Sequence, residues 1–232
     1  MRICSITVRG GSKGVPGKNL RVVAGKPLFG HSVAQAVATG LFDEVVVSSD
    51  SEEILALAPS FGATGVIRRP AEMATDTAGK VPAIAHAVRS TEERTGARYD
   101  VCVDLDATSP LRTVDDIRAA VEMFEAADVE SLITGSEARR NPYFNLVEEQ
   151  PDGTVAVSKQ PDDAVLRRQD APRCFDMNGS IYVWRRQSLL EDQVVFFPST
   201  ILYEMPAERS TDVDSEFDFR VVEWLMGERA AL

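Results

Sequence analysis

A cluster of cations and glycines follows the first apolar segment of the chain, in the stretch Arg9-Gly-Gly-Ser-Lys-Gly-Val-Pro-Gly-Lys-Asn-Leu20. Glycines let backbone N–H groups approach an anion closely, and arginine or lysine side chains add positive charge. A triphosphate is the ligand that this combination fits best. The alternative is a flexible basic loop that is exposed to solvent. The residues concerned are Arg9, Gly10, Gly11, Lys13, Gly14, Gly17 and Lys18.

The loop departs from both standard nucleotide-binding motifs. Gly11 and Gly17 stand one residue too far apart for a P-loop, and Asn19 occupies the place of its Ser or Thr. No G-x-G-x-x-G sequence occurs in the chain. The loop therefore indicates an anion site of another type.

A second group of charged residues, near the end of the chain, has the spacing of a metal site. Asp212 and Asp214 stand two residues apart in a segment that we expect to be extended, so their carboxylates point to the same face. Two hard oxygen ligands suit Mg²⁺, which completes its shell with water and substrate phosphates. Alternatively, Asp214 or Ser215 only caps the last helix, with Asp218 completing a capping box.

Further polar groups lie between an apolar run and a predicted helix, in Asp104-Leu-Asp-Ala-Thr-Ser-Pro-Leu-Arg112. Taken alone, the last five of these residues are a turn with a solvated arginine. Asp106 is, as a hypothesis, an additional ligand of Mg²⁺ or of a water molecule. The two histidines, His31 and His86, lack a nearby nucleophile or ligand pattern, so histidine-based catalysis is not expected.

Short β-rich runs alternate with helix-like segments along the first part of the chain. The strand candidates are Ile3–Val8, Glu44–Ser49, Thr64–Arg68, Asp100–Leu105 and Glu130–Thr134, and the helix candidates are Leu28–Thr39, Glu52–Phe61, Val81–Thr95 and Val114–Ala127. Thr113 and Asp116 have the spacing of a capping box. The alternation predicts βαβ units and a mainly parallel sheet. Ligands of such sheets bind beyond the carboxyl ends of the strands, which selects loops 9–19, 106–112 and 69–79.

The alternation breaks after Gly135. Residues 139–176 are polar, proline-containing and weakly periodic, and we interpret them as a small, β-rich inserted lobe. The catalytic domain is then made of residues 1–138 and 177–232. Its later elements are expected to be strands at Ser180–Trp184, Val194–Phe197 and Ile201–Met205, and a last helix from about Ser215.

Composition limits the class of protein. The 232 residues are 44% hydrophobic and 26% charged, as in ordinary globular proteins, and the net charge of −11 opposes general nucleic-acid binding. No apolar stretch is long enough to span a membrane, and we see no signal-peptide pattern. The three cysteines, Cys4, Cys102 and Cys174, are expected to be reduced. These features predict a cytoplasmic protein with no membrane or nucleic-acid partner.

Motifs along essentially the whole chain resemble those of the acylneuraminate cytidylyltransferase family, the CMP-sialic acid synthetases. They are Arg9–Leu20, Arg69-Pro-Ala-Glu-Met-Ala-Thr-Asp-Thr77, Thr108–Arg112, Arg168-Gln169, Asn178-Gly-Ser-Ile-Tyr182 and Asp212-Val-Asp-Ser-Glu-Phe-Asp218. The resemblance implies a three-layer, Rossmann-like nucleotidyltransferase fold and a homodimer. It makes the inserted lobe a dimerisation lobe that reaches over the partner's active site, where Tyr143, Phe144 and Phe175 are expected apolar contacts.

The resemblance also implies a reaction. CTP and a nonulosonic, sialic-acid-like sugar give a CMP-sugar and pyrophosphate, with Mg²⁺ as cofactor, when the anomeric hydroxyl of the sugar attacks the α-phosphorus. The implied catalytic residues are Arg9, Lys13, Lys18, Asp212 and Asp214, of which Asp212 and Asp214 bind the metal. The implied nucleotide contacts are Arg9, Gly10, Gly11, Ser12, Lys13, Lys18, Asn19, Arg69, Thr108 and Ser109. The implied sugar contacts are Asp106, Arg112, Arg168, Asn178 and Tyr182.

Two positions depart from the family. Asp106-Ala107 replaces the Gln-Pro of close bacterial members, and Asp176-Met177 stands where some members carry an arginine. Acidic groups at the border of the sugar site leave open a legionaminic, pseudaminic or Kdo-like acid instead of sialic acid itself. An alternative of another class is a non-catalytic module that binds a sugar nucleotide.

Overall fold

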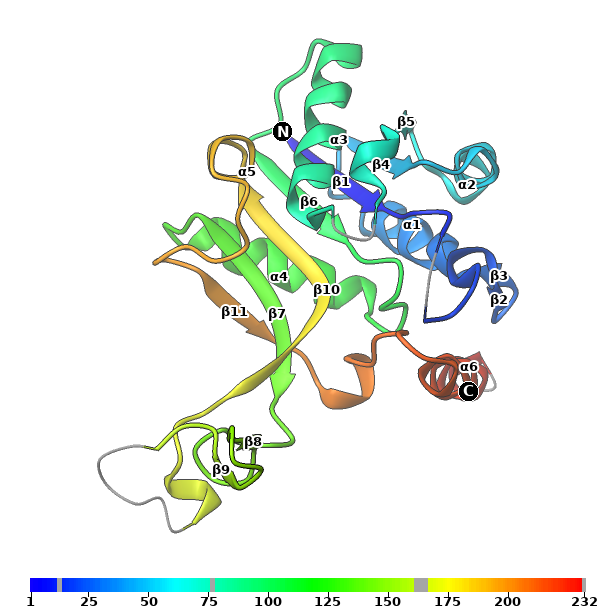
Figure 1. The fold of residues 1–232 in the computed structure, drawn as a ribbon. Helices are drawn as coiled ribbons and strands as arrows, with labels where there is room; N and C mark the ends of the chain where they lie inside the picture. Colours follow the sequence, from blue (N-terminus) through cyan, green and yellow to red (C-terminus); the bar gives the residue numbers. More distant parts are fainter. Residues whose placement is uncertain (12–13, 76–77, 161–166, 231–232) are drawn as a thin grey trace.

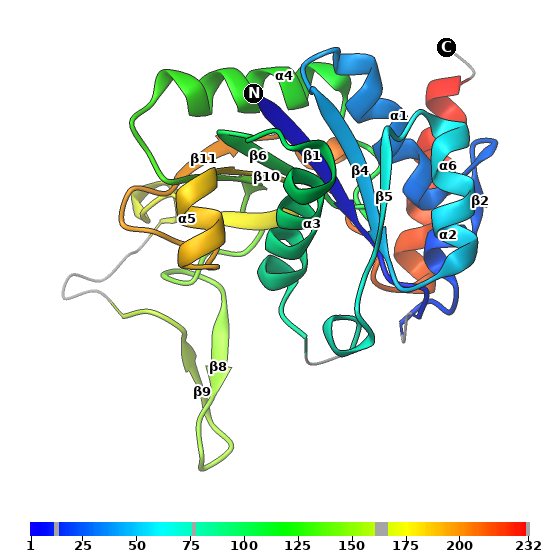
Figure 2. The same cartoon turned by 90° about the horizontal axis from the view of Figure 1, so that it is seen from above.

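The computed structural model describes residues 1–11, 14–75, 78–160 and 167–230. Its centre is a seven-stranded sheet with helices on both faces, so the predicted three-layer α/β arrangement is confirmed (Figures 1 and 2). The strands are β1 (Arg2–Thr7), β4 (Glu44–Ser49), β5 (Gly65–Arg68), β6 (Val101–Leu105), β7 (Ser131–Glu137), β10 (Phe175–Arg185) and β11 (Ile201–Glu204). The helices are α1 (Leu28–Thr39), α2 (Glu52–Leu57), α3 (Lys80–Thr95), α4 (Val114–Ala126), α5 (Arg186–Glu191) and α6 (Glu216–Ala230). None of the helices in the described ranges is both long and apolar enough to cross a membrane.

The strand order is β11-β7-β10-β6-β1-β4-β5. The pairs β1–β4, β1–β6, β4–β5 and β7–β11 are parallel. Strand β10 runs antiparallel to both of its neighbours, β6 and β7. The predicted mainly parallel sheet is therefore confirmed, with one reversed strand in its interior.

Apolar side chains form a core on each face of the sheet. On one face, Cys4 and Ile6 pack with residues of α1 and α4 such as Phe29 and Phe124. On the other face lies a second core, which includes Ile84 of α3. Strands that are covered on both faces must be apolar along nearly their whole length, which is why β1, β4 and β6 stand out in the sequence. The cysteines are free thiols, as predicted, and those of β1 and β6 are buried.

A third and smaller core joins the glycine loop to the last helix. Val15 of the loop, Val213 of the acidic segment and Phe219 of α6 are all buried in it. Arg21 reinforces the join, because its guanidinium lies 3.8 Å from the centroid of the Phe219 ring and forms an ion pair with Glu216 at 2.5 Å. Residues that are far apart in the sequence thus pack together at one edge of the molecule (Figure 1).

The predicted strand at Val194–Phe197 is wrong. This segment is irregular, and none of its residues joins a strand. The indole of Trp184 donates to the Val194 carbonyl at 3.0 Å, and the Phe197 N–H donates to the Thr200 hydroxyl at 2.6 Å. Helix α5 and the two-residue strands β2 (Val22–Val23) and β3 (Lys26–Pro27) were not expected.

Between β7 and β10 the chain leaves the sheet and projects from it (Figures 1 and 2). The projection carries a short hairpin of β8 (Val147–Glu149) and β9 (Val155–Val157). Its two ends are tied together where the Ala138 N–H donates to the Cys174 carbonyl at 2.9 Å. Phe144 on this projection is 37% exposed. The assignment of residues 139–176 as a dimerisation lobe stays a prediction.

Asp116 connects helix α4 to the chain that leads into the acidic segment. As predicted, it forms a capping box with Thr113, and its carboxylate also accepts two hydrogen bonds from the Arg209 guanidinium at 2.8 and 2.9 Å. Asp116→Ala removes the cap and this charge-assisted pair from a site that is 1% exposed. We expect a loss of about 2 to 3 kcal/mol in the free energy of unfolding, measured by urea denaturation. Asp115→Ala, one position earlier on the exposed face, should change it by less than about 0.5 kcal/mol.

Candidate active site

The loops selected from the sequence share a single cavity. Loops 9–19, 69–79 and 106–112 each contribute residues to its wall, and the cavity has a volume of about 300 Å³. Asp212 and Asp214 complete it from the C-terminal side. The cavity lies beyond the carboxyl ends of β1 and β6, as expected for a parallel sheet. Its lining includes Arg9, Gly11, Lys18, Asn19, Arg69, Lys80, Asp106, Thr108, Asp212 and Asp214.

Two hydrogen bonds to backbone groups of the glycine loop hold it in place. The Gly10 N–H donates to the Asp50 carboxylate at 2.9 Å, and the Asn19 amide donates to the Arg9 carbonyl at 2.9 Å. Gly17 has a φ of 64°, a left-handed conformation that glycine adopts without strain, and it turns the chain into the short helix that begins at Lys18. Ser12 and Lys13, two expected triphosphate ligands, lie outside the described residues.

Lys18 joins the glycine loop to the acidic segment. Its ammonium donates to the Val213 carbonyl at 2.5 Å and lies 3.4 Å from the Asp214 carboxylate. The side chain of Lys18 is 13% exposed, whereas that of Asp214 is 78% exposed. Lys18 therefore fixes the position of the segment, while the Asp214 carboxylate stays accessible to a ligand.

Asp212 has a carboxylate oxygen that is free to accept a further ligand. Its Oδ1 atom is buried and has no hydrogen-bond partner. Burial raises the pKa of Asp212, as do the nearby carboxylates of Asp106 and Asp214, and these effects outweigh the lowering by neighbouring groups such as Lys18. A buried oxygen atom that repels its neighbours and lacks a donor is suited to a cation.

The acidic pair fits the expected magnesium ion. Within the described ranges, no three side chains of His, Cys, Asp or Glu gather as a ligand cluster, so the pair stands alone. Mg²⁺ commonly takes one or two carboxylates and fills its remaining positions with water and substrate phosphates. The last helix is capped by Ser215 and Asp218, because the Ser215 N–H donates to the Asp218 carboxylate at 2.8 Å. Capping thus leaves Asp212 and Asp214 available.

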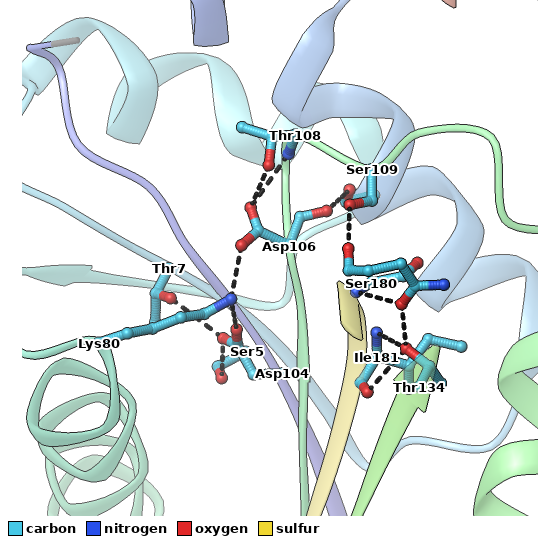
Figure 3. Close-up of polar contacts among 12 residues, drawn as sticks. Ser5, Thr7, Lys80, Asp104, Asp106, Thr108, Ser109, Thr134, Ser180 and Ile181 are labelled. Atoms are coloured by element: carbon cyan, nitrogen blue, oxygen red, sulfur yellow. Dashed lines mark hydrogen bonds and ion pairs between the residues drawn. The ribbon is translucent and has the colours of Figure 1, made fainter. Parts of the chain in front are cut away.

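A lysine that was not anticipated from the sequence lines the cavity and lies between Asp104 and Asp106 (Figure 3). The Lys80 ammonium donates to Asp106 Oδ2 at 2.6 Å and lies 3.3 Å from Asp104 Oδ2. Thr108 donates to the other oxygen of Asp106 through both its N–H, at 3.1 Å, and its hydroxyl, at 2.9 Å. Asp104 is fully buried and accepts a hydrogen bond from Ser5 at 2.8 Å.

These contacts set the charges of the cluster. Burial favours neutral Lys80, but Asp106 and Asp104 outweigh it and raise its pKa. Burial likewise opposes ionised Asp106, but Lys80 and the Thr108 hydrogen bonds prevail and lower its pKa. Burial is the main reason that the pKa of Asp104 is raised. The Lys80–Asp106 pair is therefore ionised in the cavity.

Two further residues that we expect on the nucleotide side, Arg69 and Thr108, line the cavity. Arg69 is 6% exposed and lines the cavity, while its guanidinium donates to the Ser48 carbonyl at 2.8 Å. Burial lowers its pKa. Thr108 lines the cavity beside Asp106, but Ser109 is fully buried and donates to the Asn178 carbonyl at 3.2 Å.

Arg112 does not face the cavity, and the expectation that it contacts the sugar requires correction. It is 1% exposed, and its guanidinium donates to the carbonyls of Ser109, Asp106 and Ser180. These bonds tie the loop after β6 to β10. Arg112 supports the shape of the site instead of contacting a ligand.

Asn178 and Tyr182 also have internal partners. Asn178 accepts from Thr134 at 2.7 Å and donates to Ser210 at 3.0 Å, at the irregularity in the β7–β10 pairing. Tyr182 is 6% exposed, stacks on Trp184 with ring centroids 5.4 Å apart, and lies 4.4 Å from the Lys80 ammonium. Neither side chain lines the cavity, so this geometry does not support direct contact with a sugar.

Arg168 belongs to the projection rather than to the main cavity. It lines a second cavity of about 310 Å³ and donates to the Ala138 carbonyl at 2.9 Å. The two cavities share no lining residue. Asp176 accepts a hydrogen bond from the Arg139 N–H at 3.2 Å and also lies outside the main cavity. Within one chain, Arg168 and the cavity of the glycine loop are thus separate.

Comparisons with known proteins agree with this arrangement. A family model described as Cytidylyltransferase matches residues 3–219. The chain is 43% identical over 227 residues to Post-translational flagellin modification protein B of Campylobacter coli, with 98% of this chain and 95% of that protein covered. It is 42% identical over 224 residues to CMP-N,N'-diacetyllegionaminic acid synthase of Campylobacter jejuni subsp. jejuni serotype O:2, with coverage of 97% and 94%.

A solved structure shares the fold. CMP:2-keto-3-deoxy-manno-octonic acid synthetase complexed with CTP superposes with a TM-score of 0.72 over 98% of this chain and 99% of that chain. The sequence identity is 18%, so this likeness concerns the fold alone.

Proposed function

The chain belongs to the cytidylyltransferase family, and from this premise we propose that it transfers the CMP group of CTP to the anomeric hydroxyl of a nonulosonic acid. The hydroxyl oxygen bonds to the α-phosphorus, the bond from that phosphorus to the bridging oxygen breaks, and pyrophosphate leaves. The hydroxyl proton passes to water. The observation that carries the proposal is the single cavity in which the cationic glycine loop faces the unpartnered oxygen of Asp212.

The glycine loop holds the triphosphate in this proposal. Phosphoryl-type transfer depends on positioning and on neutralising the charge of the leaving group. Arg9 and Lys18 line the cavity and supply positive charge for this task. The ribose and base then lie toward Asn19 and Arg69, and Thr108 lies near the reacting phosphate.

Asp212 and Asp214 are proposed to hold Mg²⁺. When bound, the ion supplies positive charge that offsets the phosphate oxygens. The residues themselves provide two hard oxygen ligands on a segment that Lys18 and the Val213 N–H hold in place, the latter by donating to the Thr108 carbonyl at 3.0 Å.

The acceptor is proposed to be a legionaminic-type acid. The relative from Campylobacter jejuni that is 42% identical is named for N,N'-diacetyllegionaminic acid. Asp106, an acidic group in the cavity, offers an acceptor to the hydroxyl or amide N–H groups of such a sugar. Because Arg168 lies in the projection, we further propose a homodimer in which Arg168 of one chain serves the cavity of its partner and binds the sugar carboxylate.

The proposal is tested by mixing the protein with CTP, Mg²⁺ and one of five acids: N-acetylneuraminic, Kdn, legionaminic, pseudaminic or Kdo. Pyrophosphate release is the measurement, and the highest kcat/KM is expected with the legionaminic acid. UTP and GTP replace CTP in the control reactions. Binding of CTP without pyrophosphate from any of the five sugars would identify a binding module instead.

A further inference from the structure

Lys80 has no role in the proposed reaction, although its side chain lines the main cavity together with Asp106. The side chains are 31% and 26% exposed, and they meet at 2.6 Å (Figure 3). The pair combines residues from two elements, because Lys80 begins α3 and Asp106 follows β6. A ligand in the cavity can therefore meet both the ammonium of Lys80 and the carboxylate of Asp106.

The lone pairs of Asp106 can be counted. An ionised carboxylate has about four acceptor positions, two on each oxygen. Thr108 occupies both positions of Oδ1, through its N–H and its hydroxyl. Lys80 occupies one position of Oδ2. One acceptor position of Oδ2 is left, and it lies beside an ammonium group.

That remaining position suits a hydrogen-bond donor and opposes a metal ion. A sugar hydroxyl or amide N–H can donate to it, since a neutral donor gains from the negative charge. A divalent cation at the same oxygen would meet the Lys80 ammonium, and like charges at such distances repel strongly away from bulk water. Asp212 differs from Asp106, because its buried Oδ1 has no hydrogen-bond partner.

We propose that Lys80 is a positioning residue that makes Asp106 a hydrogen-bond acceptor for the sugar and keeps it out of the metal site. This inference rests on the proposed function for the identity of the ligand. It also replaces the hypothesis that Asp106 is an additional ligand of Mg²⁺. The fully buried Asp104, 3.3 Å from the ammonium, holds Lys80 in place.

The first test is metal binding without any substrate. Lys80→Met removes the ammonium and keeps the bulk of the side chain, so the repulsion between Lys80 and a cation in the cavity is lost. Titration calorimetry with Mn²⁺ is expected to give about tenfold tighter binding than in the wild type. The double variant Lys80→Met with Asp106→Asn is expected to lose this gain. Unchanged Mn²⁺ affinity in Lys80→Met would overturn the proposal.

The second test compares how each variant changes the KM for the sugar and the KM for CTP. Lys80→Met and Asp106→Asn are each expected to raise the KM for the sugar by about 10- to 100-fold, while the KM for CTP changes by less than about threefold. The double variant should be little worse than either single variant, because the residues act as one unit. An equal rise in both KM values, or a rise for CTP alone, would make Lys80 a nucleotide contact and contradict the inference.

Controls separate these outcomes from misfolding and from a wrong function. Lys26→Met changes an exposed lysine outside the cavity and should leave both readouts unchanged. Asp106→Asn keeps the shape of the side chain, so it remains informative if Lys80→Met does not fold. If the wild type releases no pyrophosphate with any acid, the proposed function fails, whereas the Mn²⁺ titration still decides the metal-excluding role of Lys80.

Discussion

Replacing Asp212 by asparagine is expected to reduce pyrophosphate release by about 10³-fold at saturating CTP and Mg²⁺. Asparagine keeps the size of the side chain but removes the negative charge of the Asp212 carboxylate. The buried Oδ1 of that carboxylate has no hydrogen-bond partner within the described part of the protein. The affinity for Mn²⁺ should fall in parallel, measured by calorimetry. Asp115→Asn, an identical exchange at a side chain that is 90% exposed, should leave both values unchanged. Normal turnover by Asp212→Asn would remove Asp212 from the metal site.

The same substitution is expected to stabilise the protein when metal is absent. Because burial and neighbouring carboxylates raise the pKa of Asp212, the folded state holds the proton more strongly than the unfolded state does. The associated stability is complete below the unfolded pKa and is lost as the pH rises through the raised folded pKa. Asparagine cannot ionise, so in EDTA the Tm of Asp212→Asn should exceed that of the wild type at pH 7 and match it near pH 3.

A methyl group at Gly14 is expected to abolish most of the activity, by about 10²- to 10³-fold. A Cβ atom built there lies 2.2 Å from the Asp214 carbonyl oxygen, which is backbone and cannot turn aside. The loop and the acidic segment must separate, so the triphosphate and metal ligands of the proposed site lose their relative position. The measurement is kcat/KM for CTP with Mg²⁺.

A control for the glycine exchange is available in the last helix. A Cβ atom at Gly227 meets nothing within 4 Å, and alanine favours a helix. Gly227→Ala should therefore keep full activity and gain about 0.5 to 1 kcal/mol of stability. Full activity in Gly14→Ala would contradict the close approach of the two segments.

The helices and strands that have a periodic local sequence pattern could be predicted from the sequence. The bounds of Leu28–Thr39 and Glu44–Ser49 were predicted as they are found, because apolar periodicity, a left-handed glycine at position 40 and a buried parallel strand all leave local signals. The reversed direction of β10 leaves no such signal, since strand direction depends on which neighbours a strand pairs with. Val194–Phe197 has a strand-like composition, yet its backbone bonds to Thr200 and Trp184.

The residues of the candidate site also divide into those that could be predicted from the sequence and those that could not. The glycine loop and the pair Asp212 and Asp214 were recognisable because their chemistry is carried by residues close in sequence. Lys80 was missed because its partners, Asp104 and Asp106, belong to another element and meet it only in the folded chain. Arg112 was misassigned for the complementary reason: nothing in a turn sequence shows that an arginine is 1% exposed and bonded to three carbonyls.

Strand β10 also determines when the sheet can close during synthesis. It lies between β6 and β7, although β7 leaves the ribosome well before it. A growing chain can assemble β5, β4, β1 and β6 early, but β7 has no edge to join until residue 185 has emerged. Residues 212 and 214 follow only after that. The nascent chain is therefore expected to expose the unpaired, apolar strand β7 for a period. Protection of this strand from aggregation during translation then depends on the synthesis of the C-terminal third of the chain, which carries its partners β10 and β11.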